Sequence, residues 1–217
     1  MQSSRKIGIL LLMLIVPVFL VLFFQFFSTS HYDIPTYYEH GIDSLAACES
    51  TQEVHQVKTL QTTNALTKQG QSVDFRKQIR LVYMLSGNCQ DTCQLVLEEL
   101  SRVQGDFKGQ AELQFIVLGD STFANVSEIA ATYRQDTPEW LFLQGTEAQN
   151  QSFRQCELIL PQPGLPLNAT LVLIDGEGKI RGYYEGTLTE DVDRLIGEIR
   201  VLLYALNMKK AHANNAG

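Results

Sequence analysis

The sequence predicts an α/β domain that follows one apolar N-terminal segment. Three observations support this prediction. Buried-strand patterns alternate with amphipathic-helix patterns over residues 78–158, a hairpin pattern and a closing helix pattern occupy residues 169–207, and an almost unbroken apolar run covers residues 7–27. Alternating strands and helices are the element order of an α/β fold. With 217 residues, the chain is long enough for one domain with a sizeable core.

The apolar run at residues 7–27 predicts a transmembrane helix, because about 20 helical residues cross a hydrocarbon core of roughly 30 Å. Arg5 and Lys6 precede the run, and no charged residue follows it until Asp33. The positive-inside rule therefore places residues 1–6 in the cytoplasm and everything after the anchor outside. A cleaved signal peptide is the alternative, but its apolar stretch would be only about 7 to 15 residues long.

Composition and charge argue against several functions. The chain is 45% hydrophobic and has a formal net charge of −7. Without Arg5 and Lys6, the exported part keeps 15 of the 17 basic side chains against 24 acidic ones, a net charge of −9. Such a surface does not favour binding to nucleic acid or adhesion to anionic lipid. No Arg- and Ser-rich transit peptide precedes the anchor, which favours a bacterial inner membrane with the domain on its periplasmic face.

The elements of the exported part follow in order. Strands are predicted from short apolar runs, and helices from apolar residues at helical spacing. The closing helix has Thr189 as a candidate N-cap and an acidic first turn. The predicted parts are a juxtamembrane linker at 28–54, a domain at 55–207 and a disordered tail at 208–217; within them lie a hairpin in 53–75 turning at 68–71, strands at 78–85, 112–120 and 140–145, helices at 89–103, 126–134, 147–158 and 189–207, and a hairpin at 169–186.

The stretch LSGNCQDTCQ carries two cysteines, Cys89 and Cys93, where the first central strand gives way to a helix. Reactive groups in α/β sheets lie outside the carboxyl ends of the strands. The partial positive charge of a helix N-terminus also lowers a cysteine pKa and stabilises a thiolate. Two cysteines at this spacing can close a disulfide, hold Cu(I) or supply half of a zinc site. A static bridge or two small core residues are the structural alternatives.

The other two cysteines are Cys48 and Cys156. Disulfides persist outside the cytoplasm, so the four cysteines allow two bridges, although the sequence does not fix their pairing. A bridge between Cys48 and Cys156 and two unpaired small residues are both open.

Residues 55–207 resemble the Sco/SenC family of membrane-anchored proteins. LVYMLSGNCQDTC is similar to the family's strand and CxxxC motif, LQFIVLGDSTF to its next strand, DTPEWLFLQG to its Trp-containing segment and TLVLIDGEGKIRGYYEG to its late hairpin. The resemblance implies a thioredoxin-like fold and a function in cytochrome oxidase assembly. It further implies that the protein either delivers copper to an oxidase subunit or exchanges thiols and disulfides with a partner.

The sequence departs from the family pattern at the copper site. In the family, two cysteines and a distant histidine hold the metal, but Leu167 and Asn168 occupy the expected place of that histidine here. Two thiolates suffice for Cu(I), whereas Cu(II) needs more nitrogen or oxygen ligands. Three functions therefore remain open: a Cu(I) chaperone, a thiol–disulfide oxidoreductase, and a metal-free, non-catalytic protein that binds an assembly partner.

In the oxidoreductase interpretation, Cys89 is the attacking thiolate and Cys93 the resolving one. Thioredoxin-like enzymes place a cis-proline opposite such cysteines. Pro166 lies near that place, but Ala169 matches it better, which weakens the oxidoreductase interpretation.

Overall fold

The computed structural model describes residues 13, 15–20, 23, 34–42, 48, 53–85, 91–120, 126–133 and 139–215. The chain divides into two units, Met1–Asp33 and Ile34–Gly217. In the first unit the described residues are helical, and most of the predicted anchor at 7–27 lies outside them. None of the helices in the described ranges is sufficiently long and apolar to span a membrane.

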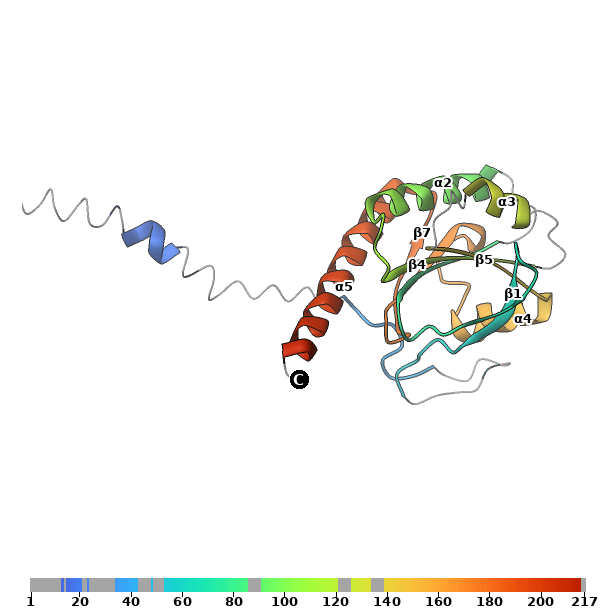
Figure 1. Ribbon diagram of the computed structural model, residues 1–217, viewed down its shortest axis with the longest axis horizontal. Helices are drawn as coiled ribbons and strands as arrows, with labels where there is room; N and C mark the ends of the chain where they lie inside the picture. Colours follow the sequence, from blue (N-terminus) through green and yellow to red (C-terminus); the bar gives the residue numbers. More distant parts are fainter. Residues whose placement is uncertain are drawn as a thin grey trace, which may run out of the picture. The chain divides into compact units, whose positions relative to one another are not determined.

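The second unit is a mixed α/β domain (Figure 1). Its elements are β1 (Leu60–Asn64), β2 (Gly70–Val73), β3 (Ile79–Met84), α2 (Asp91–Asp106), β4 (Leu113–Asp120), α3 (Val126–Tyr133), β5 (Trp140–Gly145), α4 (Glu147–Ser152), the π-helical turn η1 (Phe153–Glu157), the 3₁₀ turn η2 (Leu167–Ala169), β6 (Thr170–Ile174), β7 (Ile180–Glu185) and α5 (Thr189–Asn215).

The described strands form one sheet in the order β2-β1-β5-β4-β3-β6-β7. β3, β4 and β5 are parallel neighbours, with Leu81 opposite Phe115 and Leu118 opposite Leu143. β6 and β7 form an antiparallel hairpin that joins the sheet through β3. All residues of β3 are buried, as expected for a central strand that is covered on both faces.

Helices cover both faces of this sheet (Figure 1). One hydrophobic cluster joins alternate β3 residues, Leu81 and Tyr83, to buried residues of α2 and α5 such as Val96 and Leu195. Val82 and Met84 of β3 pack in a second cluster with Phe153 of η1 and with Val57 and Leu60 from the start of the sheet domain. α2 forms because its buried residues recur at helical spacing on one face.

The predicted strands and hairpins are confirmed with small changes at their ends. The segment predicted as one helix at 147–158 is an α-helix that continues into the π-helical turn η1. A capping box between Thr146 and Gln149 starts it. In η1 the Leu158 amide donates to the Phe153 carbonyl, and both side chains are buried in the second cluster.

The segment predicted as a linker belongs in part to the domain, which starts at Ile34 instead of residue 55. The Tyr37 amide donates to the Ile180 carbonyl of β7 at 2.9 Å. The Arg181 guanidinium of the same strand donates to the Ile34 carbonyl and to the Thr36 hydroxyl. These contacts join residues more than 140 positions apart, so no local pattern in the sequence predicts them.

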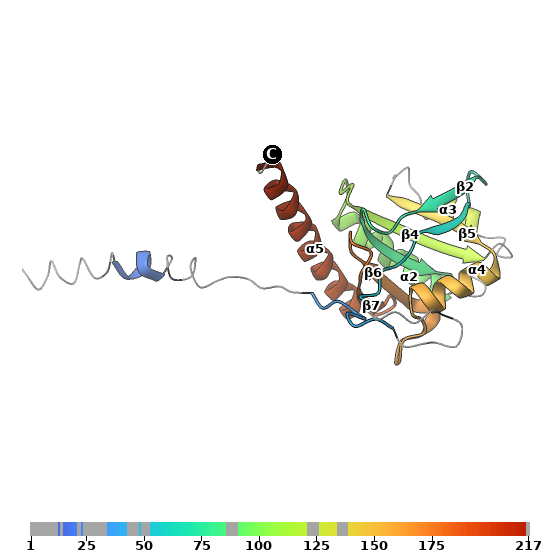
Figure 2. The same cartoon turned by 90° about the horizontal axis from the view of Figure 1, so that it is seen from below.

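The C-terminal segment also differs from its prediction. α5 continues through Asn215, so most of the tail predicted to be disordered at 208–217 is helical. Figure 2 shows this long helix running past the sheet. Two ion pairs hold its last turns, Lys209 to Glu177 at 2.7 Å and Lys210 to Glu112 at 2.9 Å.

Candidate functional site

The candidate site lies where β3 ends and α2 begins. The Leu85 amide donates to the Leu118 carbonyl and holds this end of β3 against β4. Cys93 lies in the first turn of α2, is 8% exposed and packs in the hydrophobic cluster that α2 shares with β3. Its sulfur is bonded in a disulfide. Cys89, the other predicted site residue, lies outside the described residues, as do its neighbours at 86–90.

The turn η2 packs against α2. Its Ala169 is buried in the cluster that contains Cys93, whereas the Leu167 side chain packs against the second cluster. Tyr83, the fifth residue of β3, orients this turn. Its hydroxyl donates to the Asn168 carbonyl at 2.8 Å, and burial raises its pKa well above the usual range of a tyrosine. The sequence pattern did not single out Tyr83 as a site residue. Its signal is a tyrosine inside an apolar strand, since a buried hydroxyl needs a partner.

The connection between β7 and α5 contacts both η2 and α2. The Gly186 amide donates to the Ala169 carbonyl at 2.7 Å. A Cβ atom at Gly186 would come within 3.0 Å of the Val96 side chain and 3.1 Å of the Ala169 carbonyl oxygen. A side chain at residue 186 would therefore force its neighbours to shift, so glycine favours this close approach of α2, η2 and the β7–α5 connection.

Ala169 matches the position of the cis-proline of thioredoxin-like enzymes better than Pro166 does, as the sequence indicates. Ala169 is fully buried and stands immediately before β6. Pro166 begins the η2 turn, and the only cis peptide bond in the described ranges is Leu160–Pro161.

A metal cluster is not evident at this site. Among the described residues, no three His, Cys, Asp or Glu side chains are grouped so that they could hold a metal ion. His55 donates through Nε2 to the Glu157 carbonyl at 2.7 Å, beside the turn η1 and away from η2. Cu(I) accepts sulfur ligands alone, whereas Cu(II) prefers nitrogen ligands, and the described residues of η2 include no histidine.

The second cysteine pair forms a disulfide. Cys48 and Cys156 are bonded with an S–S distance of 1.98 Å and a Cα–Cα distance of 5.4 Å. The bridge lines a cavity of about 940 Å³ together with His55 and Lys58. Cys156 belongs to η1, which packs against the sheet face opposite to that of Cys93. The bridge is therefore separate from the candidate site.

Comparisons with known proteins identify the fold. No family model matches the chain, and no curated protein matches its sequence. Solved structures do match. A SCO1/SenC family lipoprotein from Bacillus anthracis is 19% identical with a TM-score of 0.56, over 68% of this chain and 95% of that one. BsSco, a member of the Sco family of cytochrome c oxidase assembly proteins, is 16% identical with a TM-score of 0.56, over 70% and 95%.

A third match is the copper-bound ScoI of Bradyrhizobium japonicum, which is 14% identical with a TM-score of 0.51 over 68% of this chain and 99% of that one. At these identities the matches show a likeness of fold. The seven-stranded mixed α/β domain fits the thioredoxin-like fold of Sco structures. The Sco/SenC resemblance seen in the sequence is thereby confirmed as a resemblance of fold.

Proposed function

We propose that this chain is a Sco-like protein that acts in cytochrome oxidase assembly by thiol–disulfide exchange through Cys89 and Cys93. The observation that carries the proposal is the state and place of Cys93: a buried, disulfide-bonded cysteine in the first turn of α2, at the carboxyl end of a central strand. Because Cys48 pairs with Cys156 and the sequence has four cysteines, we assign Cys89 as the partner of Cys93.

The burial of Cys93 suits the role of the resolving cysteine, since its sulfur offers little surface to a second protein. In the reduced protein, the Cys89 thiolate attacks a disulfide of the partner, and one partner sulfur leaves as a thiolate. The Cys93 thiolate then attacks the Cys89 sulfur, closes the intramolecular disulfide and expels the second partner sulfur. The dithiol loses two electrons and two protons, and the partner's disulfide gains them. The reverse sequence oxidises a partner dithiol.

Cu(I) delivery is the second candidate function. Copper-bound ScoI has the same fold, and the two sulfurs of Cys89 and Cys93 would hold Cu(I) in a near-linear arrangement. With Leu167 and Asn168 at the expected place of the histidine, no third ligand is available from η2. The third candidate is a non-catalytic, metal-free protein that binds an assembly partner.

The location follows from the N-terminal segment. We propose that residues 7–27 anchor the chain in a bacterial inner membrane and that the domain from Ile34 onward faces the periplasm. Arg5 and Lys6 on the cytoplasmic side support this orientation. In that compartment the Cys48–Cys156 disulfide is stable, and a dithiol meets an oxidase subunit or a thiol–disulfide partner.

The test uses the full-length chain in detergent. The protein is equilibrated with glutathione redox buffers, its free thiols are mass-tagged, and its reduction is compared with that of the Cys89→Ser, Cys93→Ser double variant. A reversible two-electron transition that the double variant lacks supports exchange. A Cys89–Cys93 bridge that resists reduction until the protein unfolds would refute it.

The same two proteins, after selective reduction, are titrated with Cu(I) against a competing chelator. Stoichiometric binding that disappears in the double variant would favour copper delivery without a histidine. Equal binding by both proteins would exclude Cys89 and Cys93 as a metal site and leave exchange or partner binding.

A further inference from the structure

Two large apolar side chains are exposed beside the candidate site. Leu95, two residues after Cys93 in α2, is 52% exposed, and Leu188, in the connection from β7 to α5, is 51% exposed. Most other apolar residues of α2 and of the first half of α5 are buried. Exposed leucines at a reactive end of a domain are therefore candidates for contact with another molecule.

The two leucines belong to one surface. Arg102 of α2 pairs with Asp193 of α5 at 2.9 Å, and Asp106 of α2 pairs with Arg200 of α5 at 3.1 Å. These pairs show that the helices run side by side in the same direction. At 1.5 Å per residue, Leu95 lies about 10 Å before Arg102 along α2.

Leu188 lies about 8 Å before Asp193 by the same measure, and its carbonyl accepts the Val192 amide in the first turn of α5. Both leucines therefore lie at the Cys93 end of the two helices. The close approach of Val96 and Gly186 at this end brings the two elements together.

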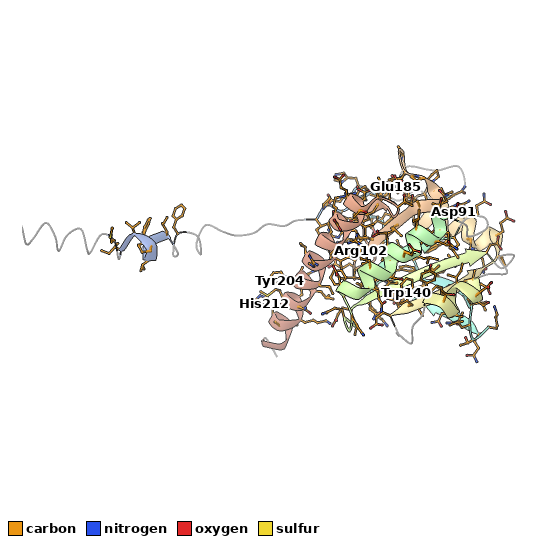
Figure 3. All side chains as sticks on the ribbon, turned by 90° about the horizontal axis from the view of Figure 1, so that it is seen from above. Asp91, Arg102, Trp140, Glu185, Tyr204 and His212 are labelled. Carbon is orange, nitrogen blue, oxygen red and sulfur yellow. A yellow bond between two sulfur atoms is a disulfide. The ribbon has the colours of Figure 1, made fainter. Side chains whose placement is uncertain are left out.

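Three exposed acidic residues lie close to these leucines in the sequence. Asp91 and Glu98 are exposed and stand four residues before and three residues after Leu95, so they flank it along α2. Glu190 is exposed two residues after Leu188. Figure 3 shows Asp91 at the same end of the domain as Glu185 of β7.

The segments that meet here, 91–98, 165–170 and 185–191, contain no Lys, Arg or His. Asp91, Glu98 and Glu190 form no ion pair with a described residue. Their charges are therefore available to a second molecule.

We propose that Leu95, Leu188, Asp91, Glu98 and Glu190 form the docking surface for the partner of the dithiol. This inference rests on the proposed function and specifies the partner's chemistry: a protein whose cysteine site lies in an apolar patch ringed by lysine or arginine. The apolar centre contributes affinity as it is removed from water. The acidic ring speeds the encounter, rejects acidic partners and makes binding depend on salt.

The test measures binding and exchange separately on the full-length protein. Two fluorescent peptides carry the same central Leu and a cysteine pair in a disulfide, flanked in one by lysines and in the other by glutamates. We expect the lysine peptide to bind about tenfold more tightly at low salt and the difference to shrink at high salt. Equal affinities for the two peptides would overturn the proposed surface.

The variant that neutralises the acidic ring is Asp91→Asn, Glu98→Gln, Glu190→Gln. It should lower the affinity for the lysine peptide about fivefold to tenfold, while exchange with neutral hydroxyethyl disulfide persists. A variant that binds the lysine peptide as well as the parent protein would overturn the proposal.

The matched control removes three exposed negative charges that likewise form no ion pair with a described residue, with Glu39→Gln, Glu128→Gln and Glu147→Gln. It should keep the parent's preference for the lysine peptide; losing that preference would mean that net charge, and not the surface around Leu95, attracts the peptide. A failure of the proposed function has another signature, because exchange with hydroxyethyl disulfide would then be absent whatever the peptides bind.

Discussion

Tyr83 illustrates how one buried polar atom orders the candidate site. Its ring packs in the cluster that contains Cys93, and its hydroxyl reaches the Asn168 carbonyl in η2. A carbonyl in a turn without a partner is free to reorient, whereas this hydrogen bond fixes it. The turn η2, where the Sco/SenC resemblance implies a histidine, is thus held by a residue 85 positions earlier.

Replacing Tyr83 by phenylalanine should reduce the free energy of unfolding by about 1 kcal/mol, because a buried hydrogen bond is lost while the packing of the ring is kept. Urea denaturation of the full-length protein in detergent measures this change. Tyr204→Phe is the matched control, since Tyr204 is 67% exposed and its change should stay within about 0.5 kcal/mol. Equal effects of the two substitutions would contradict a structural role for the Tyr83 hydroxyl.

Asp175 is the buried carboxylate that organises the β6–β7 hairpin. One of its oxygens accepts the Glu177 and Lys179 amides at 2.8 and 3.0 Å. The other accepts Nε of Arg181 at 2.7 Å. With 8% of the Asp175 side chain and 18% of the Arg181 side chain exposed, neither charge is well solvated without the other.

Asp175→Ala should therefore lower the free energy of unfolding by about 3 to 5 kcal/mol, because it leaves a mostly buried guanidinium unpaired. The same denaturation experiment measures it. Asp74→Ala removes a carboxylate from an exposed pair, since 63% of its partner Arg76 is exposed, and should cost no more than about 1 kcal/mol. If both aspartates gave a small effect, the buried pair would not stabilise the hairpin.

At the scale of elements, the strands and helices that bury apolar residues at a regular period were predictable. β3, β4 and the β6–β7 hairpin lie where their apolar runs indicate, and α5 begins at Thr189, the first residue of the predicted helix. The end of α5 was not predictable. Lys209 and Lys210 reach acidic residues 32 and 98 positions away, and such contacts leave no periodic signal in the helix itself.

The ion pair between Lys209 of α5 and Glu177 should be detectable in a pH titration. Hydrogen bonds from Lys179 and Lys209 lower the pKa of Glu177 from 4.5 to about 2. Because the folded pKa is depressed, the stabilisation is present above the unfolded value and is lost as the pH falls through about 2. NMR titration of the Glu177 carboxyl should show this low midpoint.

Lys209→Gln should move that midpoint toward 4.5 and speed hydrogen exchange in the last turns of α5. Lys108→Gln, which removes a basic residue after α2, should leave the titration of Glu177 unchanged. A midpoint near 4.5 in the parent protein would mean that Lys209 does not hold the helix end.

At the scale of the whole molecule, one covalent bond joins distant parts of the chain. Cys48 and Cys156 are separated by 108 residues, so their disulfide restricts the unfolded chain over half its length. Cys48→Ser, Cys156→Ser should lower the free energy of unfolding by about 2 to 5 kcal/mol, measured by denaturation without reductant. The change should leave the reduction of Cys89 and Cys93 nearly unaltered, because the bridge lies on the other face of the sheet. A shifted reduction potential would show that the two disulfides are coupled.

The candidate site was predictable only in part, because contacts between residues far apart in the sequence leave no local pattern. The cysteine spacing and the strand-to-helix position identify Cys93, and the sequence has Leu167 and Asn168 where the Sco/SenC resemblance implies a histidine. The meeting of α2, η2 and the β7–α5 connection is a tertiary arrangement, so the acidic and apolar surface around Leu95 emerges only once the fold is known.

The segment at residues 34–42 has a practical consequence for the molecule's solubility. β7 is an outermost strand of the sheet, and an outer strand with unpaired amides and carbonyls is a template on which other chains can stack. The hydrogen bond from Tyr37 to Ile180, with the anchoring of Ile34 by Arg181, places the chain's own backbone along that border. A fragment that begins at residue 55 would leave the outer edge of β7 exposed and is expected to self-associate. A fragment that begins before Ile34 keeps its own backbone along this edge.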